Sequence, residues 1–281
     1  MLDTIGFVGG GIMAAAMIQG LLEKNLTTPD LIMASAPRPK RRTELETQYH
    51  IRTTGDNREV ACNSRTVVLS VKPQMLARVL PELKGCLTPD QLVISIAAGG
   101  RISTISQGLG HTAVVRAMPN APAQIGEGLT VWTATPSVTQ VQRDQAQAIF
   151  QALGKEILVD DEKYLDMATA VSGTGPTYVF MVLEALIDAA VHLGFPRHVA
   201  HDIVVETMRG SILFAQESGK HPAELRNMVT SPGGTSAEAI YQMEKGTLRT
   251  VLSKAVWAAY QKSRLLGETV GKPEPRHPVD A

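Results

Sequence analysis

The sequence lacks several features on which large classes of protein depend. Only 4% of its 281 residues are aromatic, too few for the stacking platforms that bind single-stranded nucleic acids. The 27 basic side chains are balanced by 27 acidic ones, so no positive excess favours a nucleic-acid partner. We therefore expect a protein that acts on a small molecule and binds no nucleic acid.

Cysteine is scarce, and metal ligands do not cluster. Cys62 and Cys86 are too few for a disulfide framework or a four-cysteine zinc site, so both thiols are expected to be reduced. His198 and His201 share one helical face without a third ligand, so no metal is expected either. Because the first residues also show no signal-peptide pattern, we expect a cytoplasmic protein.

Long uninterrupted apolar runs are missing as well. The most apolar long segment, 177–194, contains two carboxylates and a histidine, and we expect it to be too polar and too short to cross a membrane. Apolar residues still make up 44% of the chain, which is enough for a substantial core. Charged residues make up 19%, a little below the usual quarter, which indicates extra burial, for example between subunits.

Short apolar runs alternate with helical patterns over the first half of the chain. Several runs are rich in Val and Ile without polar alternation, which is typical of strands covered on both faces. The runs are 4–8, 31–34, 66–71, 92–97, 113–117, 129–133 and 156–159. Segments such as 12–24 and 138–153 have helical spacing between them, so we predict an α/β domain over 1–160 with a Rossmann-like, doubly wound parallel sheet.

The second half has a different pattern, without a convincing strand. Helical stretches occupy 162–170, 176–194, 196–218, 221–229, 235–245 and 247–268, punctuated by Gly and Pro. We predict an all-helical C-terminal domain over 161–281. Its proline-rich end, 269–281, is expected to be disordered.

The strongest local motif is Gly9-x-Gly11-x-x-Ala14, which follows the first predicted strand and opens a helix. In a dinucleotide-binding turn Gly9 permits the tight bend, Gly11 admits the pyrophosphate, and Ala14 allows close helix–strand packing. The free N–H groups at the helix start favour phosphate oxygens. The motif alone is weak, but its position between strand and helix makes a turn without a ligand the less favoured interpretation.

The end of the second predicted strand bears on the choice of nucleotide. NAD sites usually carry an acid there to hold the ribose 2′-hydroxyl, but this strand ends in Ser35 followed by the basic run 38–42. A hydroxyl with cations suits a 2′-phosphate, so we predict NADPH over NADH. We assign this role to Ser35 and Arg38, and expect Arg42 to lie on a solvated helix face.

Other candidate site residues follow later strands or precede helices. Ligands bind at the carboxyl ends of strands in open α/β sheets, so the segment 70–73, Ala97 and Asn120 are plausible cofactor contacts. Two loops, 171–176 and 230–236, offer hydroxyls and glycine N–H groups before helices, an arrangement that binds carboxylates. Simple helix capping, with Thr235 and Glu238 as a capping box, is an equal alternative from these residues, although capping does not require Pro-Gly-Gly.

Five blocks of sequence, in order, resemble those of the pyrroline-5-carboxylate reductase family. The blocks are 6–14, 70–73, 116–122, 170–180 and 231–235, and the resemblance extends over residues 4–268. It implies NADPH-dependent reduction of 1-pyrroline-5-carboxylate to L-proline, the final step of proline biosynthesis. It also implies a homodimer built through the helical domains, often assembled into a decamer, with each active site between one subunit's Rossmann domain and its partner's helical domain.

The resemblance also assigns roles to individual residues. The cofactor site would be lined by Gly9, Gly10, Gly11, Ile12, Met13, Ser35, Asn57, Ser70, Val71, Lys72 and Pro73. The substrate would be held by Ser172 and by the loop residues Ser231, Pro232, Gly233, Gly234, Thr235 and Ser236. Because a protonated imine is already electrophilic, little acid–base machinery is needed, and Thr235 or Ser236 is the candidate catalytic hydroxyl. The family usually has a second threonine at position 236 and an amide at position 228, where this chain has Ser236 and Met228.

Three rival functions remain at this point. A β-hydroxyacid dehydrogenase would carry a catalytic lysine four residues after its glycine motif, and none follows Gly175 before the next loop. A non-catalytic NADPH sensor would leave the Ser-Pro-Gly-Gly segment without a role. A reductase of a related imine, such as one with a six-membered ring, is the third alternative.

Overall fold

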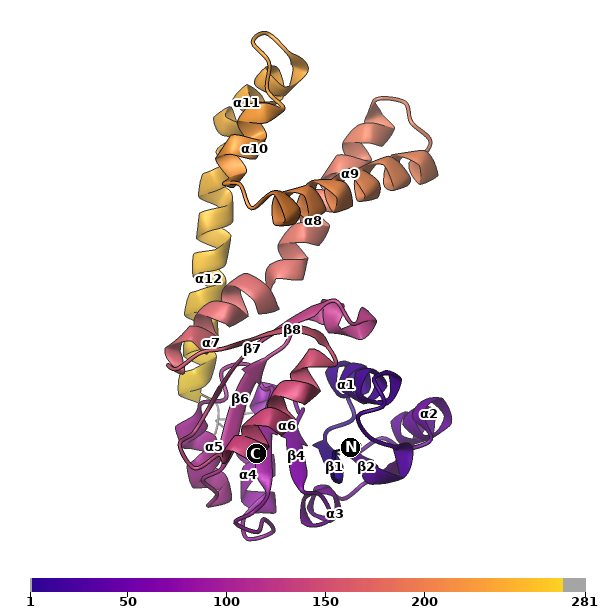
Figure 1. Ribbon diagram of the computed structural model, residues 1–281, viewed down its shortest axis with the longest axis vertical. Coiled ribbons are helices and arrows are strands. Elements are labelled where there is room, and N and C mark those ends of the chain that lie inside the picture. The colour runs from indigo at the N-terminus through magenta and orange to yellow at the C-terminus, as the bar shows by residue number, and fades with distance from the viewer. Residues whose placement is uncertain (1, 270–281) are drawn as a thin grey trace, which may run out of the picture. The chain divides into compact units, whose positions relative to one another are not determined.

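The computed structural model describes residues 2–269, and two compact units can be distinguished within them (Figure 1). The first unit comprises Met1–Thr174 together with the chain from Ala258 onward, and the second comprises Gly175–Trp257. The proline-rich end for which we expected disorder lies outside the described residues, apart from Thr269, which closes the last helix.

The first unit contains an eight-stranded sheet with the strand order β3-β2-β1-β4-β5-β6-β7-β8. Its strands are β1 Ile5–Val8, β2 Ile32–Ser35, β3 Arg52–Thr54, β4 Thr66–Leu69, β5 Leu92–Ser95, β6 Val114–Met118, β7 Gly128–Ala134 and β8 Gly154–Leu158. All seven predicted strands are confirmed, while the short edge strand β3 was missed. The predicted parallel sheet is confirmed for β1 to β6, whereas β7 pairs antiparallel with β6 and β8 follows the direction of β7.

Helices cover both faces of this sheet. They are α1 Ile12–Glu23, α2 Pro39–Tyr49, α3 Asn57–Cys62, α4 Leu76–Leu83, α5 Ile102–Leu109, α6 Gln140–Gln151 and α7 Lys163–Ala168. Short 3₁₀ turns occupy Pro29–Leu31, Pro73–Met75 and Ala121–Ile125. Local sequence explains some boundaries: α6 begins with a capping box between Thr139 and Gln142, and α5 ends at Gly110 with φ of 68°.

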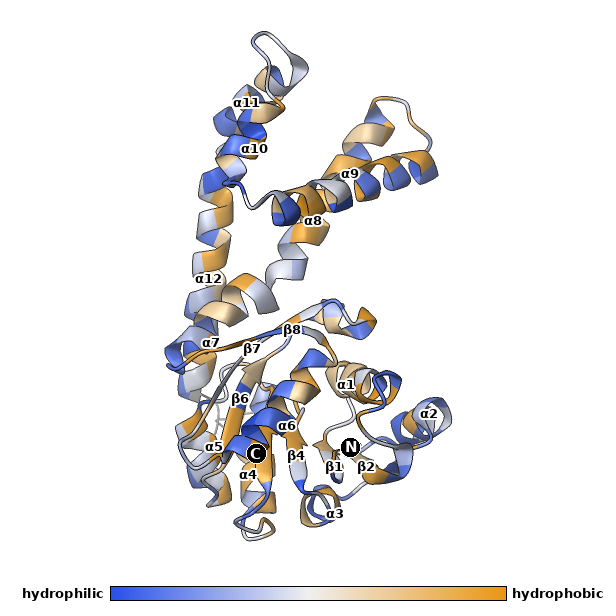
Figure 2. Ribbon diagram, in the orientation of Figure 1, coloured by the Kyte–Doolittle hydropathy of each residue, from blue (hydrophilic) through white to orange (hydrophobic). Residues whose placement is uncertain are grey.

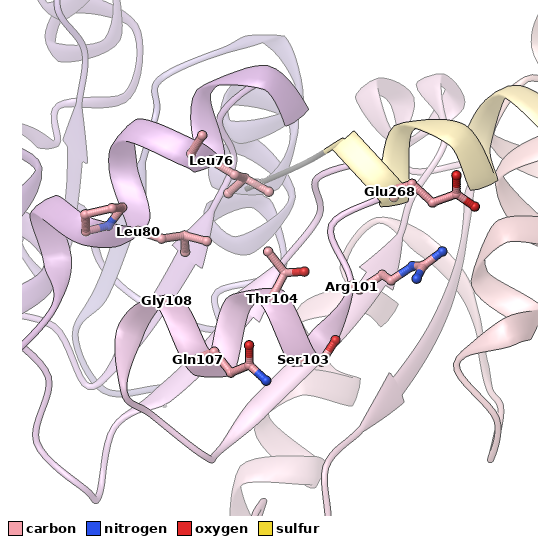
Figure 3. Close-up of a pocket in the computed structure, with 11 residues that line it drawn as sticks. Leu76, Leu80, Arg101, Ser103, Thr104, Gln107, Gly108 and Glu268 are labelled. Atoms are coloured by element: carbon pink, nitrogen blue, oxygen red, sulfur yellow. The ribbon is translucent and has the colours of Figure 1, made fainter. Parts of the chain in front are cut away.

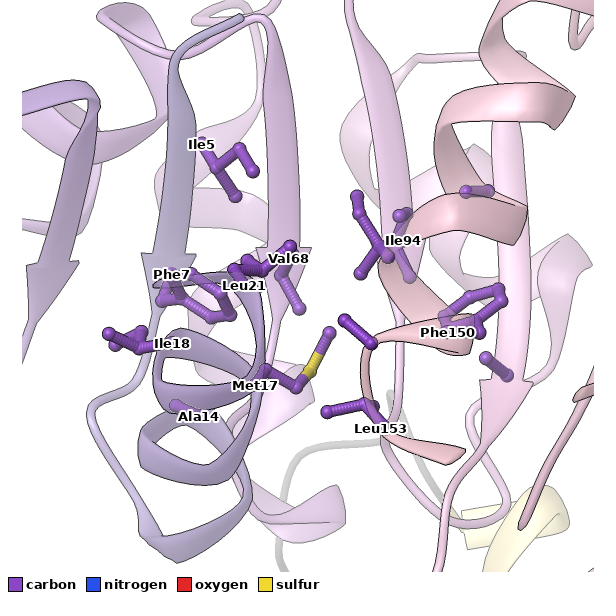
Figure 4. Close-up of a cluster of buried hydrophobic side chains, with 14 of the residues drawn as sticks. Ile5, Phe7, Ala14, Met17, Ile18, Leu21, Val68, Ile94, Phe150 and Leu153 are labelled. Atoms are coloured by element: carbon purple, nitrogen blue, oxygen red, sulfur yellow. The ribbon is translucent and has the colours of Figure 1, made fainter. Parts of the chain in front are cut away.

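The core of this unit consists of two apolar layers, one on each face of the sheet. One layer packs Phe7 and Val68 of the sheet against Met17 of α1 and Phe150 of α6 (Figure 4). The other layer joins the opposite face to α3, α4 and α5. With helices on both faces, a parallel order and a reversal of strand order between β1 and β4, this is a Rossmann fold.

The second unit is helical and has very few buried side chains. It contains α8 Gly175–His192, α9 Arg197–Ser218, α10 Pro222–Met228, α11 Thr235–Lys245 and the first part of α12 Leu248–Thr269. Of the 18 residues of α8 only Ile187 is buried, although the helix is strongly apolar (Figure 2). Phe180 and Met181 are 59% and 65% exposed, so the unit, taken by itself, presents an apolar surface.

The segment 171–176, expected to be a loop, is helical. A π-helical turn, Thr169–Gly173, joins α7 to α8, so helix runs continuously over Lys163–His192. This run is long and apolar enough to cross a membrane by length and composition alone, which corrects our expectation of a segment too short and too polar to do so. A single helix of this kind is weak evidence for a membrane span, because the core helix of a protein that does not enter a membrane passes the same test.

Candidate active site

The glycine motif forms a tight turn between β1 and α1. Gly9 has φ of 104°, and a Cβ atom at this position would lie 2.9 Å from Val71 Cγ1 and 3.1 Å from the Ser70 backbone. A Cβ on Gly11 would meet nothing closer than 4.0 Å, so the space above this residue is open. Ala14 is fully buried against the sheet. The three positions therefore have the geometry that a dinucleotide-binding turn requires.

Ser35 lies at the end of β2 and is connected to the glycine turn and to α3. Its Oγ accepts a hydrogen bond from the Gly9 N–H (3.1 Å), and its hydroxyl donates to Asn57 Oδ1 (2.6 Å). The Asn57 amide in turn donates to Glu82 Oε2 at 3.1 Å. One chain of hydrogen bonds thus connects the end of β2, the glycine turn, α3 and α4. It lies where the ribose of a dinucleotide cofactor is expected.

Arg41 is a residue of this site that sequence analysis missed. Its Nε donates to the Gly10 carbonyl at 2.7 Å, and its Nη2 approaches the Gly11 carbonyl at 3.3 Å. Its Nη1 pairs with Glu44 at 3.0 Å. The basic run 38–42 contained the signal, but only the helical turn of α2 determines which of its cations faces the glycine turn.

We expected the neighbouring Arg42 to lie on a solvated helix face, and this expectation was wrong. Its Nη1 donates to the carbonyls of Ala36 (2.9 Å) and Pro37 (3.4 Å), so it holds the loop between β2 and α2. Arg38, by contrast, is exposed and lines the cavity beside the glycine turn. The two arginines therefore differ in what they can offer to a ligand.

A cavity of about 320 Å³ follows the glycine turn. It is lined by the predicted cofactor residues Gly9, Gly10, Gly11, Ser35, Asn57, Ser70, Val71 and Lys72. Its charged lining consists of Arg38, Arg41, Lys72 and Arg78 against the single carboxylate of Glu82. A cavity with backbone N–H groups and a positive excess fits a dinucleotide phosphate. Five predicted residues lie outside it: Ile12, Met13, Pro73, Ala97 and Asn120.

Asn120 follows β6 and contacts the π-helical turn. Its Oδ1 accepts from the Leu129 N–H at 2.9 Å, and its Nδ2 lies 3.3 Å from Ser172 Oγ. A Cβ atom on Gly173 would lie 2.6 Å from Met118 Cε, so the turn packs closely against the end of β6. These contacts bring Ser172, a predicted substrate residue, next to the carboxyl edge of the sheet.

The predicted substrate loop, 231–236, is described within the second unit alone. Gly233 has φ of 67°, and the Gly234 N–H closes a turn on the Ser231 carbonyl at 3.0 Å. Gly234 is the N-cap of α11 and no side chain caps this helix, so the capping box through Thr235 is wrong. Among the described residues, the hydroxyls and N–H groups of Thr235 and Ser236 make no hydrogen bond, which leaves them available to an anion.

A second cavity, of about 590 Å³, lies between α4, α5 and the end of α12 (Figure 3). It offers scattered polar groups of Arg101, Thr104, Gln107 and Glu268 beside the apolar side chains of Leu76 and Leu80. It has neither a glycine turn nor a converging set of donors, so we do not place the reaction there. Within residues 2–269 no cluster of three potential metal ligands occurs, and both cysteines are free.

Arg116, which lies in β6 upstream of the predicted cofactor contact Asn120, has a structural role. It is 3% exposed and pairs with Glu162 and Asp166, both at 2.9 Å. Glu162 also accepts the first N–H of α5, and Asp166 accepts from Ser263 of α12. This buried ion-pair cluster joins β6, α5, α7 and α12 within the first unit.

Comparison with known families and sequences agrees with this geometry. A family model described as pyrroline-5-carboxylate reductase dimerisation matches residues 162–266, and one described as NADP oxidoreductase, coenzyme F420-dependent, matches residues 4–99. A pyrroline-5-carboxylate reductase of Synechocystis is 40% identical over 264 residues, covering 94% of this chain and 98% of that protein. The Escherichia coli enzyme is 36% identical over 270 residues, covering 96% of this chain and 100% of that protein.

Solved structures give the same result. The Plasmodium falciparum pyrroline carboxylate reductase with NADP bound superposes with a TM-score of 0.88 at 30% identity, covering 94% of this chain and 98% of that one. A pyrroline-5-carboxylate reductase from Coxiella burnetii superposes with a TM-score of 0.84 at 36% identity, with the same coverage.

Proposed function

The chain belongs to the pyrroline-5-carboxylate reductase family, and on this premise we propose how its residues divide the NADPH-dependent reduction of 1-pyrroline-5-carboxylate to L-proline. The observation that carries the assignment is the joint presence of a phosphate-binding turn at Gly9–Gly11 and an uncapped Ser-Pro-Gly-Gly turn before α11. NADPH supplies the hydride when it is bound. The protein binds the cofactor and the substrate, orients them toward each other and excludes water from the site.

The Rossmann unit is the cofactor site in this proposal. The N–H groups of the glycine turn bind the pyrophosphate, and Ser35 with Arg38 binds the 2′-phosphate. The cavity's four cations against one carboxylate support NADPH as the ligand. We propose residues 1–160 as the cofactor-binding domain and 161–281 as the helical dimerisation and substrate domain, whereas compactness alone groups 161–174 and the chain from Ala258 with the first unit.

The turn at 231–236 is the substrate site. Its free N–H groups and the positive end of α11 bind the substrate carboxylate, with Ser231 and Gly233 shaping the turn. Thr235 or Ser236 faces the ring nitrogen through its hydroxyl. Hydride adds to the carbon of the protonated imine, and the π electrons of the C=N bond become the lone pair on the nitrogen of the product amine, which keeps its proton.

The assembly follows from the apolar surface of the second unit. The family model covering 162–266 describes dimerisation, so the protein is an oligomer, and we propose that α8 is covered by a second copy. In the proposed dimer, the substrate turn of one subunit completes the cofactor site of its partner. Assembly into a decamer and a cytoplasmic location complete the proposal.

The first experiment is to follow the loss of NADPH absorbance with purified protein and 1-pyrroline-5-carboxylate, with proline quantified as product. Rapid oxidation with stoichiometric proline is the expected result. NADPH binding without turnover of any imine would instead favour a sensor, and turnover of a six-membered cyclic imine alone would favour a related imine reductase.

The role of the hydroxyls is tested with a Thr235→Ala, Ser236→Ala double variant. We expect turnover to fall about 10- to 100-fold with NADPH affinity unchanged, because the hydroxyls meet only the substrate in this proposal. A Ser211→Ala change on α9, whose hydroxyl bonds to its own helix, is the control. Unchanged turnover in the double variant would count decisively against the assignment.

A further inference from the structure

A contact between Asn120 and Ser172 places a serine hydroxyl beside the edge of the sheet at which cofactors bind. Asn120 lies two residues after β6, which is parallel to β5, so the carboxyl ends of β1, β4, β5 and β6 share one edge. Ser172 reaches this edge through the π-helical turn. Both residues are half-buried and belong to the Rossmann unit.

The hydrogen bonds determine which way the Asn120 amide is turned. The Leu129 N–H can only donate, and it points at Asn120 at 2.9 Å, so this side of the amide must be the oxygen. The amide nitrogen therefore faces Ser172. Because that nitrogen is only a donor, Ser172 Oγ must accept at the 3.3 Å contact.

Because Ser172 accepts the hydrogen bond from Asn120, the proton of its own hydroxyl is free to be donated to another group. Among residues 2–269 no acceptor for the Ser172 hydroxyl is found. Because Ser172 is only half-buried, this free donor can be completed by water or by a ligand that reaches the edge of the sheet. The asparagine thus makes Ser172 a directed hydrogen-bond donor.

The π-helical turn explains how the serine is held in this position. The Thr174 N–H reaches the Thr169 carbonyl five residues back at 2.8 Å, and the Thr174 hydroxyl donates to the same carbonyl at 2.9 Å. On the side of β6, Met118 packs closely against Gly173: a Cβ atom there would lie 2.6 Å from the methionine's terminal methyl group, which would have to move. Single π turns inside helices are often found at functional sites, where the extra residue redirects a side chain.

We propose that Ser172 donates a hydrogen bond to the carboxamide oxygen of the nicotinamide, with Asn120 as the residue that directs its proton. The inference rests on the proposed function, because it needs NADPH bound along this edge of the sheet. It reassigns Ser172 from the substrate to the cofactor. A fixed carboxamide restricts rotation of the nicotinamide ring and so determines which face of the ring delivers hydride.

The direct test compares the binding of NADP⁺ and its thionicotinamide analogue, in which a weakly accepting sulfur replaces the carboxamide oxygen. Calorimetry should show that the native protein prefers NADP⁺ by about 3- to 10-fold, the value of one neutral hydrogen bond. Ser172→Ala should bind both ligands equally, and Ser172→Thr should restore the preference.

Asn120→Asp provides an independent variant that keeps the serine. One carboxylate oxygen still accepts from Leu129, while the other now accepts from Ser172 and turns its proton away from the ligand. This variant should therefore lose the preference as Ser172→Ala does. Thr174→Val removes a hydrogen bond of the π turn but leaves the direction of the Asn120–Ser172 hydrogen bond unchanged. This variant should therefore prefer NADP⁺ over the thionicotinamide analogue as strongly as the native protein does.

A second readout is the stereochemistry of hydride transfer from NADPH deuterated on one face of the ring. We expect the native enzyme to use one face only and Ser172→Ala to show measurable transfer from both. An NADP⁺ preference that survives in both Ser172→Ala and Asn120→Asp would overturn the inference. That outcome would be distinct from failure of the proposed function, which would appear as native protein without imine reduction.

Discussion

The two units of this protein use apolar residues in opposite ways. The Rossmann unit buries them in two layers around its sheet, so that Phe7, Ile18 and Phe150 are almost fully shielded from water. In the helical unit only Ile187, Ala200 and Val204 form a buried cluster, while other apolar residues of α8, such as Phe180 and Met181, are exposed. One unit is complete as a single chain, and in the proposed dimer the other acquires its core on association.

The largest expected effect lies within the self-contained unit. Arg116→Met leaves Glu162 and Asp166 without their buried cation, so we expect a loss of about 3 kcal/mol in the free energy of unfolding, measured by urea denaturation. Arg197→Met removes the exposed pair with Asp188 and should cost about 0–1 kcal/mol. Equal losses in the two variants would show that burial of the pair is unimportant.

The helical unit should respond through association rather than folding. Phe180→Asp places a charge on the exposed face of α8, and we expect the dimer dissociation constant to rise on the order of 100-fold in sedimentation experiments. Ile125→Asp is the matched control, because Ile125 is 78% exposed on the Rossmann unit and should not affect assembly. A Phe180→Asp protein that remains dimeric would place the interface elsewhere.

A smaller effect is expected where the Rossmann unit meets its ligand. Gly9→Ala brings a methyl group within 2.9 Å of Val71 and requires a strained φ, so NADPH affinity should fall about 10- to 100-fold. Gly85→Ala carries a similar strain at φ of 80°, but its Cβ would meet nothing within 4 Å. If both variants bind NADPH equally well, the glycine turn does not contact the cofactor.

The smallest effect concerns the arginine that sequence analysis missed. Arg41→Gln removes a cation at the glycine turn, and we expect NADPH binding to weaken about 3- to 10-fold at low salt, with a smaller difference at high salt. Arg42→Gln removes an arginine that does not line the cavity and should change affinity less than about two-fold. The reverse order of effects would identify Arg42 as the phosphate contact.

Much of the architecture was predictable because it depends on local periodicity. Seven strands and the six helical segments after residue 160 appear close to their predicted positions, since Val- and Ile-rich runs and 3.6-residue patterns are local signals. Strand β3, Arg52–Thr54, was missed because three polar residues at a sheet edge have no apolar signal. The antiparallel direction of β7 depends on pairing with β6, which no local pattern encodes.

The candidate site also contains some residues that the sequence could identify and others that only the folded structure could. The glycine motif, Ser35 and the Ser-Pro-Gly-Gly segment could be selected from their residue types and order. Sequence could not separate capping from ligand binding at Thr235, because the choice depends on which residue has N-cap geometry, and this is Gly234. Arg41 and Arg42 are neighbours in sequence, but the helix directs them to different carbonyl groups.

Residue chemistry and spacing alone established the Rossmann-like domain, the helical domain, the NADPH preference and the family resemblance, because each depends on short motifs in a particular order. The direction of β7, the π-helical turn, the buried Arg116 cluster and the orientation of the Asn120 amide required the folded chain. These features join groups that are distant in sequence, and a hydrogen bond or ion pair is specified by distance and direction in space.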